Sequence, residues 1–201
     1  MARINGPKCR LCRRVGAKLN LKGTRCDGEK CAMNKRPYAP GQHGNARRRR
    51  ASEYSVQLIG KQKAKLIYGV LERQFKNYVL KAMKSPGISG ETLYTLLESR
   101  LDNVVYRSGL AVSRAQARQL IRAKVFAVND GLVISPAYQL KKGDIVKPVD
   151  FSKVHLREGF VLPEWLKADV KERHVVYERA PVLEDFNEGY EIQQIIDFYS
   201  R

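Results

Sequence analysis

The sequence predicts an α+β protein with three parts: a four-cysteine nodule, a helical domain that is discontinuous in sequence, and a small α/β module inserted into it. All four cysteines lie near the N-terminus, in a segment rich in glycine and proline. Apolar residues then recur at helical spacing between residues 52 and 84, and again close to the C-terminus. Short apolar runs separated by turn residues follow residue 123. We expect the nodule and a basic arm over 1–46, the helical domain over 47–90 plus about 175–201, and the module over 91–174.

The charge of the chain is strongly positive and unevenly distributed. Among 201 residues there are 38 Lys and Arg against 20 Asp and Glu, a net charge of +18. Residues 1–50 hold 15 basic and 2 acidic residues, whereas residues 151–201 hold 7 basic and 10 acidic ones. A positive field attracts polyanions, nucleic acid first and anionic membranes second. The first half of the chain is therefore expected to meet the polyanion.

The sequence holds no sign of a membrane or secreted protein. No run of about 18 apolar residues is present, so we expect no transmembrane segment. The N-terminal stretch MARINGPKCRLCRR lacks the apolar core of a secretory signal. We therefore expect a cytoplasmic protein whose cysteines are reduced or bound to metal.

The four cysteines have the spacing of a metal site. Cys9 and Cys12 form a C-x2-C pair, and Cys26 and Cys31 form a C-x4-C pair thirteen residues further on. Two such thiolate pairs can close a tetrahedron around a soft cation. Two disulfides and a redox pair are the alternatives, and a reducing compartment argues against both. We expect zinc, with an iron–sulfur cluster as the alternative.

The helical part begins at Ser52, after a segment 1–46 with no sustained helical or strand period. One helical stretch runs around 54–68, and a second carries Leu71, Phe75, Tyr78, Val79 and Ala82 on one face. The break SPGISGE at 85–91 has the composition of a linker. Near the C-terminus, Ile192, Ile195, Ile196 and Tyr199 have helical spacing. We expect this last helix to pack against the helices of residues 52–84.

The module starts with one helix whose apolar face runs from Leu93 to Val105, with Gly109 at its C-terminal end. A second helix follows, opened by the capping-box pair Ser113 and Gln116. Strands are predicted at KVFAVN, LVI, DIVKPV and HVVYE, with a tight turn at NDG. A short helix is predicted at PEWLKAD, because proline suits a first helical turn.

The second helix of the module carries arginines and no acid. At about 100° per residue, Arg114, Arg118 and Arg122 fall within an arc of about 80°. A solvated face usually mixes both signs of charge, which favours reading this arginine row as a phosphate-binding surface. A helix, a turn, a basic helix and a hairpin also describe a winged helix-turn-helix, so duplex DNA is a rival ligand.

A basic arm follows the cysteines. Four consecutive arginines end the stretch RPYAPGQHGNARRRR, and guanidinium groups match phosphate oxygens. A disordered tail or a transport signal is the alternative reading. The candidate RNA-binding residues are Arg3, Lys8, Arg10, Arg13, Arg14, Lys18, Arg36, Tyr38, Gln42, His43, Arg47, Arg48, Arg49, Arg50, Ser113, Arg114, Gln116, Arg118 and Arg122.

We find no pattern that favours catalysis. His43, His155 and His174 are scattered, and no P-loop, dinucleotide-binding glycine motif or zinc-protease motif is present. We therefore expect neither an enzyme nor a small-molecule substrate.

The stretch LLESRLDNVVYRSGLAVSRAQARQLIRAKVFAVNDGLVI resembles the RNA-binding module that is named after small-subunit ribosomal protein four. The upstream stretch YAPGQHGNARRRRASEYSVQLIGKQKAKLIYGVLERQF resembles the ribosomal protein family itself, and the likeness continues to the C-terminal FYSR. The cysteine quartet occurs in only some members, so the metal prediction depends on the spacing alone. In this RNA-binding module a histidine and a glycine usually lead into the first strand, whereas this sequence has RAKVF there.

The resemblance implies a structural constituent of the small ribosomal subunit and a primary binder of 16S rRNA at a multi-helix junction of the 5′ domain, where it nucleates assembly. It also implies contact with small-subunit ribosomal protein five and other small-subunit proteins, a place near the region where mRNA enters, and an influence on translational accuracy. The acidic C-terminal stretch fits a basic protein partner better than RNA. Its candidate partner-facing residues are Glu184, Asp185, Glu188 and Glu191.

Overall fold

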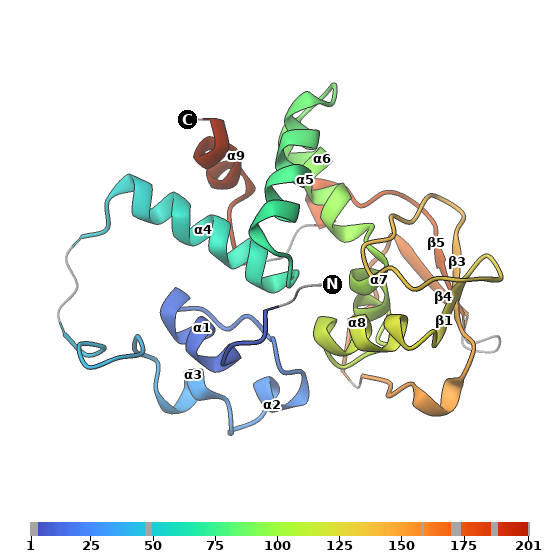
Figure 1. Cartoon of the computed structure of the whole chain (residues 1–201), viewed down its shortest axis with the longest axis horizontal. Helices are drawn as coiled ribbons and strands as arrows, with labels where there is room; N and C mark the ends of the chain where they lie inside the picture. The colour runs from blue at the N-terminus through green and yellow to red at the C-terminus, as the bar shows by residue number, and fades with distance from the viewer. Residues whose placement is uncertain (1–3, 47–49, 158, 170–173, 186–188, 201) are drawn as a thin grey trace. The chain divides into compact units, whose positions relative to one another are not determined.

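The computed structural model describes residues 4–46, 50–157, 159–169, 174–185 and 189–200. The chain divides into two units. Figure 1 colours the chain by residue number, from blue at the N-terminus to red at the C-terminus. The first unit is Met1–Gly90 together with Asn187–Arg201, and the second unit is Glu91–Phe186. The helical part is therefore discontinuous, and the chain returns to it at residue 187 and not near residue 175. The later return follows from strand β5 (His174–Tyr177), which pairs within the sheet of the second unit.

The nodule holds three short helices that the sequence pattern did not predict. They are α1 (Lys8–Val15), α2 (Thr24–Asp27) and α3 (Ala32–Lys35). α1 ends at Gly16, whose φ of 76° is the left-handed conformation that terminates helices. Because the helices span eight, four and four residues, none is long enough to produce a clear apolar period.

The longer helices of the first unit are α4 (Glu53–Ile67), α5 (Glu72–Lys84) and α9 (Ile192–Ser200). Ser52 caps α4, since its hydroxyl accepts a hydrogen bond from the backbone N–H of Ser55 at 3.3 Å. The C-terminal helix α9 packs against α4 and α5, as its apolar spacing predicts. Ile195 is fully buried in this packing, and the rings of Phe75 and Tyr199 lie 6.4 Å apart.

A polar cluster reinforces the contact of α9. The carboxylate of Glu72 accepts hydrogen bonds from Lys61 Nζ at 2.7 Å, Lys65 Nζ at 2.9 Å and the Tyr199 hydroxyl at 2.7 Å. Burial alone would raise the pKa of Glu72, but these three hydrogen bonds outweigh it and hold the pKa at about 2. Glu72 therefore stays ionised and ties α9 to the other two helices.

The second unit combines helices with a five-stranded antiparallel sheet. Its helices are α6 (Ser89–Glu98), which begins at the boundary of the units, α7 (Leu101–Arg107) and α8 (Arg114–Arg122). The strands are β1 (Phe126–Val128), β2 (Gly131–Leu132), β3 (Ile145–Pro148), β4 (Leu166–Asp169) and β5, in the order β2-β1-β3-β5-β4. Short 3-10 helices cover Phe151–Lys153 and Leu183–Asp185. Asn129 and Asp130 form the predicted tight turn, with φ of 47° and 67°.

The single helix predicted over residues 93–105 is wrong, because the chain forms two helices, α6 and α7. The break falls at Ser99 and Arg100, where Arg100 forms a β-bridge with Gln139 and the Leu140 N–H donates to the Ser99 carbonyl at 2.9 Å. Gly109 does end the second of these helices, with φ of 76°. The apolar period continued through the break because both helices bury the same kind of face.

The helix predicted at PEWLKAD is also wrong, because residues 166–169 form strand β4. Trp165 and Leu166 are 1% and 3% exposed and belong to the core of the second unit. Pairing with β5 satisfies the backbone of this segment, which outweighs the helix-start preference of Pro163.

The core of the second unit lies between the sheet and helices α7 and α8 (Figure 1). Val104, Val105 and Ile121 from the helices meet Phe126 and Val146 from the sheet, all at most 1% exposed. In the described part of the chain, no helix is long and apolar enough to cross a membrane. This packing fixes α8 against α7, and the candidate site depends on that contact.

Candidate nucleic-acid interface

Helix α8 has a capped start and a buried apolar face. The hydroxyl of Ser113 accepts a hydrogen bond from the Gln116 N–H at 3.2 Å, and Gln116 Oε1 accepts one from the Val112 N–H at 2.9 Å. These bonds satisfy backbone donors at the helix start, as the capping-box spacing predicts. Ala117 and Ile121 are fully buried. The structure thus uses the polar atoms of Ser113 and Gln116, two candidate RNA contacts, to start the helix.

The arginine row Arg114, Arg118 and Arg122 lies on another face of α8, and α7 supports two of its members. Arg114 Nε donates to Asn103 Oδ1 at 2.7 Å, and its guanidinium lies 4.5 Å from the centre of the Tyr106 ring. Arg118 Nη1 lies 3.8 Å from Asp102 Oδ2. Arg122 is exposed to solvent.

A buried polar network lies beneath the row. Arg100, fully buried, makes a two-pronged ion pair with Asp102 through contacts of 3.0 Å and 2.7 Å. The carboxylate of Glu98, also fully buried, accepts hydrogen bonds from Asn103 at 2.8 Å and from Arg107 at 3.0 and 3.1 Å. Buried charges need such partners, because an unpaired charge is costly to remove from water. The network fixes Asp102 and Asn103, and these residues in turn position Arg118 and Arg114.

Arg157 also belongs to this surface, and sequence reasoning missed it. Its guanidinium lies 4.9 Å from the centre of the Tyr106 ring, which Arg114 also contacts. The Arg157 N–H donates to the Gly109 carbonyl at 2.8 Å, which holds this part of the chain beside the end of α7. A single arginine in a loop has no periodic partner in the sequence, so no pattern could have indicated it.

The four cysteines all lie on or beside the short helices of the nodule. Cys9 and Cys12 belong to α1, Cys26 to α2, and Cys31 precedes α3. All four are free thiols, and Cys12, Cys26 and Cys31 are buried. Burial raises the pKa of the Cys12 thiol, and the nearby Cys26, Cys9 and Cys31 raise it further.

The cysteines fit a metal by their chemistry, but their arrangement is incomplete. Four thiols are the donor set that zinc and iron–sulfur clusters take. The Lys22 N–H donates to Cys26 Sγ at 3.3 Å, a contact that suits a thiolate. Throughout the described residues, however, no group of three or more Cys, His, Asp or Glu side chains is gathered closely enough to hold a metal ion.

The basic residues of the nodule have different roles. Arg13 binds the protein itself, because its Nε and Nη2 donate to the carbonyls of Tyr38 at 2.9 Å and Ala39 at 3.3 Å. Lys8 Nζ donates to the Leu21 carbonyl at 3.4 Å. The side chains that project into solvent are Arg10, Arg14, Lys18, Arg36, Tyr38, Gln42, His43 and Arg50. The candidates Arg3, Arg47, Arg48 and Arg49 lie outside the described residues.

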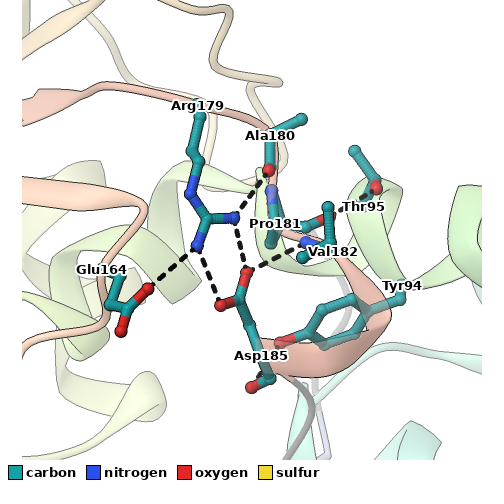
Figure 2. A network of polar contacts seen from close by, with 8 residues as sticks. All are labelled: Tyr94, Thr95, Glu164, Arg179, Ala180, Pro181, Val182 and Asp185. Atoms are coloured by element: carbon teal, nitrogen blue, oxygen red, sulfur yellow. Dashed lines mark hydrogen bonds and ion pairs between the residues drawn. The ribbon is translucent and has the colours of Figure 1, made fainter.

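The described acidic candidates near the C-terminus belong to two different units of the chain. Figure 2 shows the carboxylate of Asp185 turned toward Arg179, with oxygen-to-nitrogen distances of 2.8 and 3.0 Å. Asp185 also accepts from the Val182 N–H at 3.0 Å, so its carboxylate closes its own loop. The same hydrogen bonds lower the pKa of Asp185. Glu184 is exposed in the second unit, Glu191 is exposed in the first, and Glu188 lies outside the described residues.

The loop that Asp185 closes is attached to α6. The Thr95 hydroxyl donates to the Pro181 carbonyl at 3.0 Å, and the Tyr94 hydroxyl donates to the Asp185 carbonyl at 3.2 Å (Figure 2). Arg179 also reaches Glu164 at 3.4 Å. These contacts fix the last described segment of the second unit.

Two protein families and several relatives of full length match this chain. Residues 3–98 match the family described as "Ribosomal protein S4/S9 N-terminal domain", and residues 99–146 match the "S4 domain". The chain is 48% identical over 207 residues to small ribosomal subunit protein uS4 of Dictyoglomus turgidum, with both chains covered in full.

Two further relatives have the same coverage. The uS4 proteins of Thermus thermophilus and Acidithiobacillus ferrooxidans are 47% and 44% identical to this chain over 209 residues, again with both chains covered in full. These matches lead to one conclusion: the chain belongs to the uS4 family of small ribosomal subunit proteins.

Proposed function

We propose that this chain is a structural constituent of the small ribosomal subunit that binds 16S rRNA directly, and that it is not an enzyme. The observation that carries the proposal is the oriented arginine row of α8, which stands on the polar network of α7 and is joined by Arg157 at the Tyr106 ring. Membership of the uS4 family supports it. The finer expectation is a multi-helix junction of the 5′ domain, whose occupation nucleates subunit assembly.

The side chains suit recognition of RNA shape better than reading of base edges. Guanidinium groups bind phosphate oxygens through paired hydrogen bonds. A-form RNA has a deep, narrow major groove that side chains cannot read, so proteins bind it mainly through backbone and shape. A row of arginines held at set positions fits the phosphates of a folded junction.

The test compares an rRNA junction fragment with a DNA duplex of equal length in filter-binding titrations over a series of salt concentrations. Replacing Arg114, Arg118 and Arg122 with Gln should weaken junction binding and flatten its salt dependence. Each lost phosphate contact lowers the slope of log K against log salt by about 0.7–0.9. The matched control replaces the exposed lysines Lys141, Lys142 and Lys167 of the same unit.

Equal loss in both triple variants would mean that general charge, and not the row, drives binding. Tighter binding to duplex DNA than to the junction would favour the rival reading, a metal-containing regulator of DNA. Either result would overturn the proposed RNA interface.

For the nodule, we propose that the four cysteines hold one structural metal ion, zinc in preference to an iron–sulfur cluster. The support is the four free thiols, three of them buried, together with the two-pair spacing. A bound zinc would supply folding free energy to loops that have little apolar core of their own. Elemental analysis of the purified chain distinguishes zinc from iron. Cys9→Ser with Cys31→Ser should release the metal and expose residues 4–46 to protease, while Trp165 fluorescence stays native.

We also propose that Glu191 faces a basic protein of the same subunit, with small-subunit ribosomal protein five as the expected partner. The side chain is exposed and acidic in a chain of net charge +18. This partner, and a place near the region where mRNA enters, would give the chain an influence on translational accuracy. Reversing Glu191 to Lys should leave rRNA affinity unchanged, weaken binding to protein five and raise misreading. If neither the binding to protein five nor the translational accuracy changed, Glu191 would be an acid that only contacts solvent.

A further inference from the structure

Strand β2 lies at one end of the five-stranded sheet, so one of its two sides is open. It pairs with β1 through Ala127 with Leu132 and Val128 with Gly131. In the described part of the chain, no strand pairs with its other side. An open strand presents backbone donors and acceptors to which the strand of another chain can bind. We call residues 131–134 the β2 edge.

The ladder between β1 and β3 shows which way the backbone of Leu132 points. In an antiparallel pair, every second residue exchanges backbone hydrogen bonds with the neighbouring strand. The Asn129 N–H donates to a carbonyl of β3 at 3.0 Å, and the Val149 N–H donates to the Val125 carbonyl at 2.8 Å. Ala127 lies two residues from both of these positions, so its backbone groups also point to β3. Ala127 and Leu132 therefore form a pair without hydrogen bonds, and the N–H and C=O of Leu132 point away from β1, out of the sheet.

The side chains of the β2 edge alternate as in an extended strand. Leu132 and Ile134 are 58% and 51% exposed, whereas Val133 between them packs against the core of the second unit. The alternation continues past the two residues that pair with β1. Exposed edge strands usually carry lysine, proline or a bulge that prevents further pairing, but the run GLVIS at 131–135 has no charge and no proline. The β2 edge thus has the composition of a strand that another strand covers.

Exposed positive charge lies next to the turn that leads into β2. Asn129 Nδ2 donates to Asp144 Oδ1 at 2.8 Å, and the Lys141 N–H donates to Asp144 Oδ2 at 2.8 Å. These hydrogen bonds engage the carboxylate of Asp144 and hold the turn of Lys141 and Lys142 beside Asn129. The side chains of both lysines are exposed. The other acid of this region, Asp130, pairs with a lysine of β3. An acidic segment is therefore attracted to this end of the edge.

We propose that the β2 edge binds an extended, acidic segment of another protein chain, which adds a strand to the sheet. The segment accepts a hydrogen bond from the Leu132 N–H and donates one to the Leu132 carbonyl. Its apolar side chains, at alternate positions, cover Leu132 and Ile134. The inference goes beyond the proposed function, because the β2 edge uses neither the arginine row nor the cysteines.

Other occupants fit the β2 edge less well. A phosphate oxygen accepts hydrogen bonds and donates none, so RNA backbone would leave the Leu132 carbonyl without a partner. The aliphatic side chains of Leu132 and Ile134 offer no group that binds phosphate. A second copy of this chain would bring together two molecules that each carry a net charge of +18.

The first test measures by calorimetry how the full chain binds a capped seven-residue peptide in which glutamate alternates with valine. Leu132→Pro removes the outward N–H and no hydrogen bond to β1, and proline is tolerated on edge strands. The matched control, Leu132→Val, keeps both the N–H and an apolar side chain. Since one backbone hydrogen bond is lost, we expect Leu132→Pro to weaken peptide binding by about three- to tenfold and Leu132→Val to leave it nearly unchanged. Equal affinity of the two variants for the peptide would overturn the proposal.

A modified peptide guards against a folding defect in Leu132→Pro. Methylation of every backbone nitrogen of the peptide keeps its charge and side chains and removes its donors. This peptide should lose binding to the wild-type chain. If it binds as well as the unmodified peptide, side chains and net charge drive the contact, and strand addition is refuted.

Two further measurements address the other occupants. Binding of the rRNA junction fragment should be equal in Leu132→Pro and Leu132→Val, and the wild-type chain should sediment as a monomer. Weaker junction binding in Leu132→Pro alone would assign the edge to RNA, and a dimer that Leu132→Pro abolishes would assign it to a second copy; either result overturns the proposal. If the wild-type chain binds the peptide at the β2 edge but no rRNA, the proposed function fails and this inference stands.

Discussion

The buried ion pair beneath the arginine row gives the sharpest test of the site's construction. The change is Asp102→Asn, which keeps the size of the side chain and removes its charge. Asp102 is 2% exposed and holds the fully buried Arg100 through contacts of 3.0 and 2.7 Å. Removing one partner of a buried ion pair typically costs about 3–5 kcal/mol.

The loss of stability caused by Asp102→Asn can be measured for the second unit alone. The chain has one tryptophan, Trp165, which is 1% exposed in the core of that unit, so its fluorescence reports unfolding of the unit. For a unit of about a hundred residues, a loss of 1 kcal/mol lowers the midpoint of thermal unfolding by roughly 4–8 °C. A loss of about 3 kcal/mol therefore predicts a decrease of at least roughly 12 °C.

The matched control is Asp130→Asn, the same chemical change at an ion pair on the surface of the same unit. The side chain of Asp130 is 80% exposed and pairs with Lys147. Exposed pairs contribute at most about 1 kcal/mol, and Asn tolerates the positive φ of this turn position. If Asp102→Asn lowers the midpoint no more than Asp130→Asn does, the buried network does not stabilise the unit as argued.

Three further outcomes follow from particular contacts. Because the pKa of Glu72 in the folded protein is about 2, its stabilisation of the first unit is complete above its ordinary pKa and is lost as pH falls toward 2. The carboxylate is half exposed, so Glu72→Gln should lower the free energy of unfolding by no more than about 1 kcal/mol. Chemical unfolding curves of the variant should also lack this pH dependence. Gly109→Ala should cost about 1–2 kcal/mol, because φ is 76° and an added Cβ would lie 2.4 Å from the Phe160 ring; unchanged Trp fluorescence midpoints would contradict this. Asp185→Ala should increase hydrogen exchange in residues 179–185 while Glu184→Ala leaves it unchanged, and equal exchange in the two variants would remove the role of the Arg179 pair.

The sequence predicts the long elements well because their apolar periods are strong. The helices of residues 54–68 and 71–82, the C-terminal helix and the Asn129–Asp130 turn are all present in the structure. The errors come from tertiary pairing that leaves no local signal. The break at Ser99 depends on a bridge to Gln139, forty residues away, and β4 depends on pairing with β5. The preference of Pro163 for a first helical turn did not outweigh the pairing of β4 with β5.

For the candidate site, the sequence indicates which residues carry charge but not which of them the fold uses internally. Arg13 and Asp185 look like surface charges in the sequence, yet both close loops of the protein itself. Arg157 looks like an isolated charge, yet it lies at the same aromatic ring as Arg114. Such roles depend on which side chains and backbone groups the folded chain brings together, and neither spacing nor composition contains that information.

The partners of the arginine row explain how the row is held in place. Arg114 is positioned by the amide oxygen of Asn103 and by the ring of Tyr106. Arg118 lies near the carboxylate of Asp102, which also pairs with the buried Arg100. Fixing the side chains in advance lowers the entropy lost on binding. A row that is ordered before its ligand arrives therefore loses less free energy on binding than mobile surface arginines would.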